Sequence, residues 1–125
     1  MVPSWGLSYQ EPQYLVSRGI DEIVVLVTTP NGVEARKIGK RVVDAKLAAC
    51  VTIIPGVRSI YRWKDKICDD QEVLLVIKTT KRLFSKLEDM VKRLHSYDTP
   101  EIIAMPILAG SDDYLRWIRA STRNP

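Results

Sequence analysis

Two uninterrupted apolar runs constrain this chain more than any other feature of its sequence. Ile23–Val27 and Val73–Ile77 are rich in β-branched residues and do not alternate with polar ones. Such runs are typical of strands that are covered on both faces. The second run lies in a predicted return strand over Glu72–Thr79, which follows a turn at Lys64-Asp65-Lys66. The sequence therefore predicts two central strands of a sheet.

Two further predicted strands contain proline. Leu47–Trp63 is interrupted by Pro55-Gly56, and Ile102–Leu108 contains Pro106. Because proline cannot donate a hydrogen bond to a strand ladder, it is confined to edge strands and bulges. These two strands are therefore predicted to lie at the edges of the sheet, with a bend or bulge in the longer one.

Helical periodicity separates the strands. Asn31 and Glu34 form a capping-box pattern before the first helix, and Ser111 is predicted to cap a short final one. The apolar sides of the three helices are predicted to be Ala35, Ile38, Val42 and Ala45; Leu83, Leu87, Met90, Val91 and Leu94; and Tyr114, Trp117 and Ile118.

The order β-α-β-β-α-β plus a helix predicts an α+β, ferredoxin-like split β-α-β fold over residues 21–122, after a flexible extension over residues 1–20. The expected sheet is antiparallel, with strand order 4-1-3-2 and both main helices on one face. The other apolar face then needs the final helix or another subunit to cover it. Long edge strands that carry Tyr61 and Trp63 also favour a partner, so we expect a closed homo-oligomer.

The net charge of +4 does not predict binding to nucleic acid. Residues 32–46 and 81–95 each carry five bases and two acids, and both stretches are predicted helices with solvated faces. The central strands lack the aromatic residues on which RNA bases stack. No apolar run approaches the roughly 20 residues of a membrane span, so no membrane insertion is expected. Cys50 and Cys68 without a CxxC motif favour free thiols in the cytoplasm.

The chemistry-bearing residues gather in one segment. The chain has a single histidine, and no phosphate loop or hydrolase motif accompanies it, so an enzyme is not expected. His95–Glu101 combines an imidazole, a phenol and two carboxylates, which could ligate a divalent cation. The structural alternative is that His95 caps the preceding helix and Glu101 pairs with a lysine. Composition alone favours the structural alternative.

Taken together, the motifs resemble the CutA divalent-cation tolerance family over about Ile23–Thr122. The resemblance rests on these segments: Leu47-Ala48-Ala49-Cys50-Val51, Ile54-Pro55, Ser59–Lys64, Glu72-Val73, Ile77-Lys78-Thr79, His95–Ile103 and Tyr114-Leu115-Arg116-Trp117. It implies a tight homotrimer with the sheets facing inward, similar to PII signalling proteins with clefts between subunits. It also implies a part in the tolerance of divalent metals, most often copper.

The resemblance carries over to some residues and not to others. The copper site proposed for bacterial members uses a cysteine on the first strand and two adjacent histidines. Here those positions are Val27 and Leu94, so only His95 remains and a thiolate ligand is missing. We therefore predict a metal site of His95, Glu101 and Asp98. The cleft that the resemblance implies would be lined by Tyr61, Trp63, Lys78, Tyr97 and Trp117.

The sequence thus predicts a non-enzymatic, cytoplasmic homotrimer of divalent metal response that binds copper or another divalent cation and requires no cofactor. One alternative is a PII-like signalling trimer that binds a small anionic ligand, with Lys78 as the countercharge. Another is a scaffold selected for stability, whose metal affinity is incidental.

Overall fold

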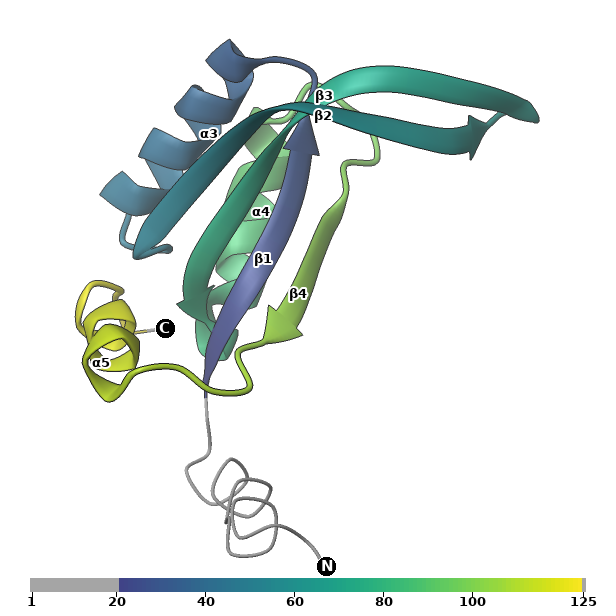
Figure 1. Ribbon diagram of the computed structural model, residues 1–125. Helices are drawn as coiled ribbons and strands as arrows, with labels where there is room; N and C mark the ends of the chain where they lie inside the picture. The colour runs from purple at the N-terminus through teal and green to yellow at the C-terminus, as the bar shows by residue number, and fades with distance from the viewer. Residues whose placement is uncertain (1–20, 125) are drawn as a thin grey trace, which may run out of the picture.

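The computed structural model describes residues 21–124, so the predicted extension over residues 1–20 lies outside the described part of the chain. The described residues form β1 Glu22–Thr29, α3 Gly32–Asp44, β2 Cys50–Trp63, β3 Lys66–Thr80, a 3-10 turn Lys81–Leu83, α4 Phe84–Leu94, β4 Ile102–Pro106 and α5 Asp112–Ala120. The strands make one antiparallel sheet in the order β2-β3-β1-β4 (Figure 1). The predicted α+β fold and strand order are confirmed.

The core lies between the sheet and the helices α3 and α4, which pack against one of its faces (Figure 1). Alternate residues of the central strands point into this core, and Val25, Val27, Leu75 and Ile77 are fully buried there. Each fully buried aliphatic side chain contributes roughly 1.5–3 kcal/mol of favourable transfer free energy. The apolar stripes that predicted the two helices supply the other side of the core: Ala35, Ile38, Val42, Leu83, Leu87 and Val91.

The second strand bends where its proline and glycine predicted. The register of β2 against β3 shifts between Ile54 and Val57, and Gly56 has φ +74°, in the left-handed region that favours glycine. Beyond the bulge, residues 57–63 pair only with residues 66–72, because β1 ends at the partner of Val73. They form a two-stranded arm that leaves the sheet at an angle (Figure 1). Lys64 and Asp65 close the arm with positive φ values of 51° and 64°.

Several strand limits differ from the predicted ones, and β1 is longer at both ends. β2 begins at Cys50 instead of Leu47, because the N–H groups of Leu47 and Ala48 donate to the Val42 carbonyl at the end of α3 (2.9 and 3.1 Å). They are therefore unavailable to the strand ladder. β3 begins at Lys66, well before Glu72, because cross-strand pairing extends along the polar arm without an apolar pattern. β4 ends at Pro106, where proline interrupts the ladder.

The helix α5 lies at one end of the sheet and leaves most of the second face open (Figure 1). Ser111 caps it, as predicted, by accepting a hydrogen bond from the Tyr114 N–H (3.2 Å). The predicted packing side was partly wrong. Leu115 and Ile118 are buried against Ala49 and Ile107, whereas the Tyr114 and Trp117 side chains are exposed. The Tyr114 and Trp117 rings instead pack against each other, with their centroids 5.5 Å apart.

The open face is largely apolar, with Lys78 and Thr52 as polar exceptions near one end. Its central residues are half-buried, and on the edge strand β4 Ile103 and Met105 are 50% and 45% exposed. Strand pairing places Ile103 beside Leu26 and Met105 beside Val24, so the side chains form one continuous surface. Contiguous exposed apolar surface of this kind marks an interaction site. Since α5 does not cover this face, the expected cover by another subunit stays a prediction.

Candidate ligand cleft

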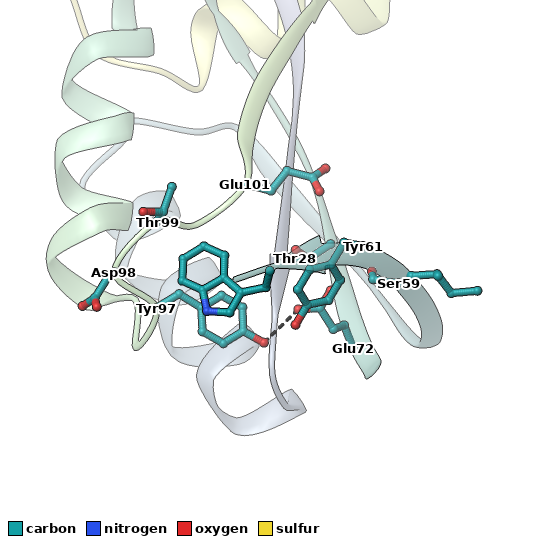
Figure 2. A pocket seen from close by; sticks show the side chains of 10 residues that line it. Thr28, Ser59, Tyr61, Glu72, Tyr97, Asp98, Thr99 and Glu101 are labelled. Carbon is teal, nitrogen blue, oxygen red and sulfur yellow. Dashed lines mark hydrogen bonds between the residues drawn. The ribbon is translucent and has the colours of Figure 1, made fainter. Parts of the chain in front are cut away.

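A cleft of about 550 Å³ opens at the end of the sheet from which the arm projects (Figure 2). Three parts of the fold enclose it: the arm, the ends of β1 and β3, and the segment that follows α4. Its lining residues are Thr28, Ser59, Ile60, Tyr61, Trp63, Glu72, Tyr97, Asp98, Thr99 and Glu101. The volume lies within the range of ordinary small-molecule sites.

His95 fixes the segment that forms one wall of this cleft. It is the C-cap residue of α4, and its buried ring reaches β1, where Nε2 donates to the Thr28 carbonyl (2.7 Å). The backbone N–H of Tyr97 donates to Nδ1 of the same ring (3.0 Å). Glu34 reinforces the segment by accepting from both the N–H and the hydroxyl of Ser96 (3.1 Å each). His95 is thus at the expected cap position, but its ring anchors the cleft wall and does not bond to the helix. The other half of that alternative is wrong, because Glu101 has no ion pair with a lysine within residues 21–124.

The first helix is capped by a simpler arrangement than the predicted capping box. Asn31 Oδ1 accepts from the Glu34 N–H (2.8 Å), which is the first half of the pattern. The Glu34 carboxylate, however, turns to Ser96 and lies 3.4 Å from His95 Nδ1. The Glu34 side chain therefore does not cap its own helix but connects the start of α3 to the cleft wall.

Two tyrosines of the cleft donate their hydroxyl protons to carboxylates. Tyr97 donates to Glu72 Oε2 (2.8 Å), as Figure 2 shows, and Tyr61 donates to Asp70. Burial, followed by the Glu72 carboxylate, raises the pKa of Tyr97 well above its ordinary value. The hydrogen bond to Asp70 raises the pKa of Tyr61 to about 12. Both phenols therefore stay neutral at physiological pH.

Glu72 is the unusual residue of the cleft. It is only 6% exposed, and Tyr97 is its only hydrogen-bond donor among the described residues. Neither Lys nor Arg is among the residues that line the cleft, and Glu72 has no ion pair within residues 21–124. Buried carboxylates normally have a cation or several hydrogen bonds. Glu72 instead has one neutral donor within residues 21–124, and it belongs to the cleft lining.

The structure brings together most, but not all, of the residues that the sequence singled out. Asp98, Glu101, Tyr61, Trp63 and Tyr97 line the cleft. The predicted members Lys78 and Trp117 do not lie in this lining. The ammonium group of Lys78 donates to Thr52 on the open face of the sheet (2.8 Å), and Trp117 stacks on Tyr114 in α5.

The predicted metal ligands are not assembled as a set within one chain. Both ring nitrogens of His95 already have partners, and Figure 2 places Asp98 and Glu101 on different sides of the cleft, with the Asp98 carboxylate pointing away from Glu72. Among residues 21–124 no group of three or more His, Cys, Asp or Glu side chains could hold a metal ion. A tightly bound ion would need ligands from a second chain or from water, so the predicted metal site stays a prediction.

Sequence reasoning missed Glu72, Thr28 and Ser59 as lining residues. One signal for Glu72 was present, since it is the carboxylate that immediately precedes the apolar run of β3. A charged residue at the margin of a buried strand is unusual enough to be examined as a functional candidate. Thr28 and Ser59 carry no comparable signal because hydroxyl side chains are ordinary in strands.

The described residues thus form a small α+β domain with an extended hairpin arm and an acidic, aromatic cleft beside it. Residues 23–121 match the family described as CutA1 divalent ion tolerance protein, and the chain belongs to this family. The divalent-cation tolerance protein CutA of Thermus thermophilus is 52% identical over 101 residues, which are 81% of this chain and 98% of that protein.

Two further comparisons agree. The chloroplastic protein CutA of Arabidopsis thaliana is 48% identical over 86% of this chain, which spans only 59% of that longer relative. The crystal structure of CutA1 from Oryza sativa superposes with a TM-score of 0.82 at 44% identity, covering 85% of this chain and 97% of that one. The resemblance found in the sequence motifs is thereby confirmed. Within residues 21–124 no helix is long and apolar enough to cross a membrane.

Proposed function

We propose that this protein is a non-enzymatic, cytoplasmic component of divalent metal response, and that it binds copper or another divalent cation as a homotrimer. The observation that carries the proposal is the charge of the cleft. Glu72, Asp98 and Glu101 line it without a Lys or Arg, although the chain as a whole has a net charge of +4. The names of the relatives, divalent-cation tolerance proteins, support the same conclusion. No resident cofactor is needed for a binding role.

The homotrimer has its own support. Ile103 and Met105 leave an apolar sheet face open, and Ile60 and Ile67 on the arm are 69% and 63% exposed. A second and third copy would cover these surfaces and the free edges of β2 and β4. Light scattering of the full chain should give three times the 14.2 kDa mass at micromolar concentration. A mass near that of one chain would refute this part of the proposal.

A metal ion bound in the cleft would draw on carboxylate oxygens, which suit hard divalent cations, with further ligands from water or a neighbouring subunit. Calorimetric titration with Cu²⁺ and Zn²⁺ tests this on the full chain. Glu101→Gln and Asp98→Asn should each weaken binding about tenfold or more, whereas Asp89→Asn, an exposed carboxylate on α4, should leave it unchanged. Equal affinities in all four proteins would exclude the cleft as the metal site.

His95 needs a separate test because it also anchors the cleft wall. His95→Ala removes the hydrogen bonds to Thr28 and Tyr97 together with any metal contact. Glu34→Gln weakens the same wall without removing an imidazole. If His95 ligates the metal, His95→Ala should lose far more affinity than Glu34→Gln. Similar losses would assign His95 to positioning alone.

The anionic-ligand alternative lacks support in the cleft, because Lys78 is not part of the lining.

A further inference from the structure

The buried carboxylate of Glu72 calls for a positive charge that the described chain does not provide. Its Oε2 accepts from Tyr97, while no group within residues 21–124 donates to Oε1. Glu72 nevertheless belongs to the cleft lining, so a ligand in the cleft can reach it. A carboxylate that is 6% exposed and has one neutral donor attracts a cation that enters the cleft, because little water solvates it there.

The walls around Glu72 are suited to an organic cation. Three aromatic residues, Tyr61, Trp63 and Tyr97, line the same cleft. The faces of such rings attract ammonium and guanidinium groups, most strongly when those groups are desolvated. The two phenols direct their hydroxyl protons toward Asp70 and Glu72, so the protons are held by carboxylates. This pattern of aromatic walls with an acid at one end is that of a site for a charged amine.

The aromatic walls and the size of the cleft suit a bare metal ion less well than an organic cation. No three metal-ligating side chains converge within the described residues, and the cleft of about 550 Å³ is far larger than one ion requires. Glu72 and Glu101 both line the cleft, so a molecule with two positive groups has two carboxylates to contact. The hydroxyl groups of Thr28, Ser59 and Thr99 add hydrogen-bond acceptors for N–H groups.

We propose that this cleft binds an alkylammonium ion, with one positive group at Glu72 and the carbon chain against the aromatic rings. A diamine would place its second ammonium group near Glu101. The inference shares the acidic cleft with the proposed metal function, and a different ligand class distinguishes the two. It concerns what occupies the cleft, whatever the chain does with divalent metals.

The test is calorimetric titration of the full chain with 1,4-diaminobutane in a buffer that contains a metal chelator. The uncharged 1,4-butanediol and the anionic butanedioate serve as matched controls of similar length. We expect the diamine to bind, and the diol and dianion to bind at least tenfold more weakly. Equal binding of diamine and diol, or no binding of the diamine, would overturn the proposal, as would preferential binding of the dianion.

Variants locate the bound amine. Glu72→Gln keeps an acceptor for Tyr97 and should weaken the diamine at least tenfold, and Trp63→Leu on the exposed arm should weaken it severalfold. Glu88→Gln, which removes a carboxylate from α4 outside the cleft, should bind like the wild type. If Glu72→Gln does not fold, as judged by circular dichroism, Trp63→Leu and Glu101→Gln carry the test. Wild-type affinity in the folded cleft variants would overturn the proposal.

The same proteins separate this inference from the proposed metal function. Copper titration without amine reports on the metal function, and amine titration with chelator reports on the cleft ligand. A chain that binds the diamine but no metal would refute only the metal proposal. A chain that binds metal but not the diamine would refute only the amine.

Discussion

Two buried glutamates at opposite ends of the sheet have opposite surroundings. Glu22 at the start of β1 is 1% exposed, and Arg119 of α5 donates to its Oε2 (2.8 Å). Glu72, where the arm leaves the sheet, is 6% exposed and receives only the Tyr97 hydroxyl. The first carboxylate is paired with an arginine of its own chain, which fastens a helix to the sheet, although its buried Oε1 has no partner within residues 21–124. The second has no such cation within these residues and faces the cleft instead.

The largest change in stability is expected when the ion pair between Glu22 and Arg119 is broken. Arg119→Ala leaves a buried carboxylate without its cation, so we expect the free energy of unfolding in urea to fall by about 2–3 kcal/mol. This is below the cost for a fully buried pair because the Arg119 side chain is 45% exposed. Arg116→Ala, which breaks an exposed pair with Asp113, is the control and should change stability by less than about 0.5 kcal/mol. Equal effects would show that the Glu22 pair is not special.

The next largest change in stability comes from neutralising each acid in turn, with Glu22→Gln and Glu72→Gln. Loss of the Glu22 charge removes a charge-assisted hydrogen bond and should cost about 1–2 kcal/mol. Loss of the Glu72 charge removes a buried ion without a cation, and the amide oxygen still accepts from Tyr97, so stability should be unchanged or rise by about 0.5 kcal/mol. Urea unfolding measures both. A larger loss at Glu72 than at Glu22 would invalidate the comparison.

Tyr97→Phe removes the donor on which Glu72 depends. We expect a loss of about 1 kcal/mol in urea unfolding, because a buried carboxylate loses a hydrogen bond. Tyr61→Phe is the matched control. Its partner Asp70 is exposed, and water can replace the hydroxyl there, so a change of less than about 0.5 kcal/mol is expected. In the double variant Tyr97→Phe with Glu72→Gln the loss should shrink, because the uncompensated charge is gone.

The smallest effect is a pH dependence in alkaline solution. The pKa of tyrosine is raised in the folded chain, to about 12 for Tyr61 and further for Tyr97, from an ordinary value of 10.0. A raised folded-state pKa stabilises the protein fully below pH 10 and loses that contribution as the pH rises through the folded value. Stability should therefore be flat up to about pH 10 and then decline, with a shallower decline in Tyr97→Phe. An identical decline in wild type and variant would contradict the role of Tyr97.

The fold was predictable because its signals are local. Ile23–Val27 and Val73–Ile77 read as central strands from their composition alone, and both are central. Pro55-Gly56 and Pro106 assigned β2 and β4 to the edges, because the missing N–H restricts proline wherever it occurs. The limits of the strands were less predictable. The N–H groups of Leu47 and Ala48 bond to α3, a choice that depends on how the helix ends.

The candidate site was only half predictable. The composition of the segment His95–Glu101 marked it as unusual. Five cleft residues followed from the resemblance or from that segment: Tyr61, Trp63, Tyr97, Asp98 and Glu101. Lys78 and Trp117 belong to the same motifs but lie elsewhere, since motif membership does not specify position along the sheet. Glu72 was missed because nothing in its own sequence neighbourhood identifies Tyr97 as its partner.

By itself, then, the sequence determined the elements, their order in the sheet and the family, because periodicity and proline act over a few residues at a time. Only the tertiary structure decided which buried acid is paired with an arginine and which faces the cleft. That outcome depends on Arg119 reaching Glu22 across 97 positions of the chain and on a bulge at Gly56 that turns the arm beside Tyr97. Burial and pairing of a charge are properties of distant segments brought together, and a carboxylate has the same sequence signature whether or not a cation meets it.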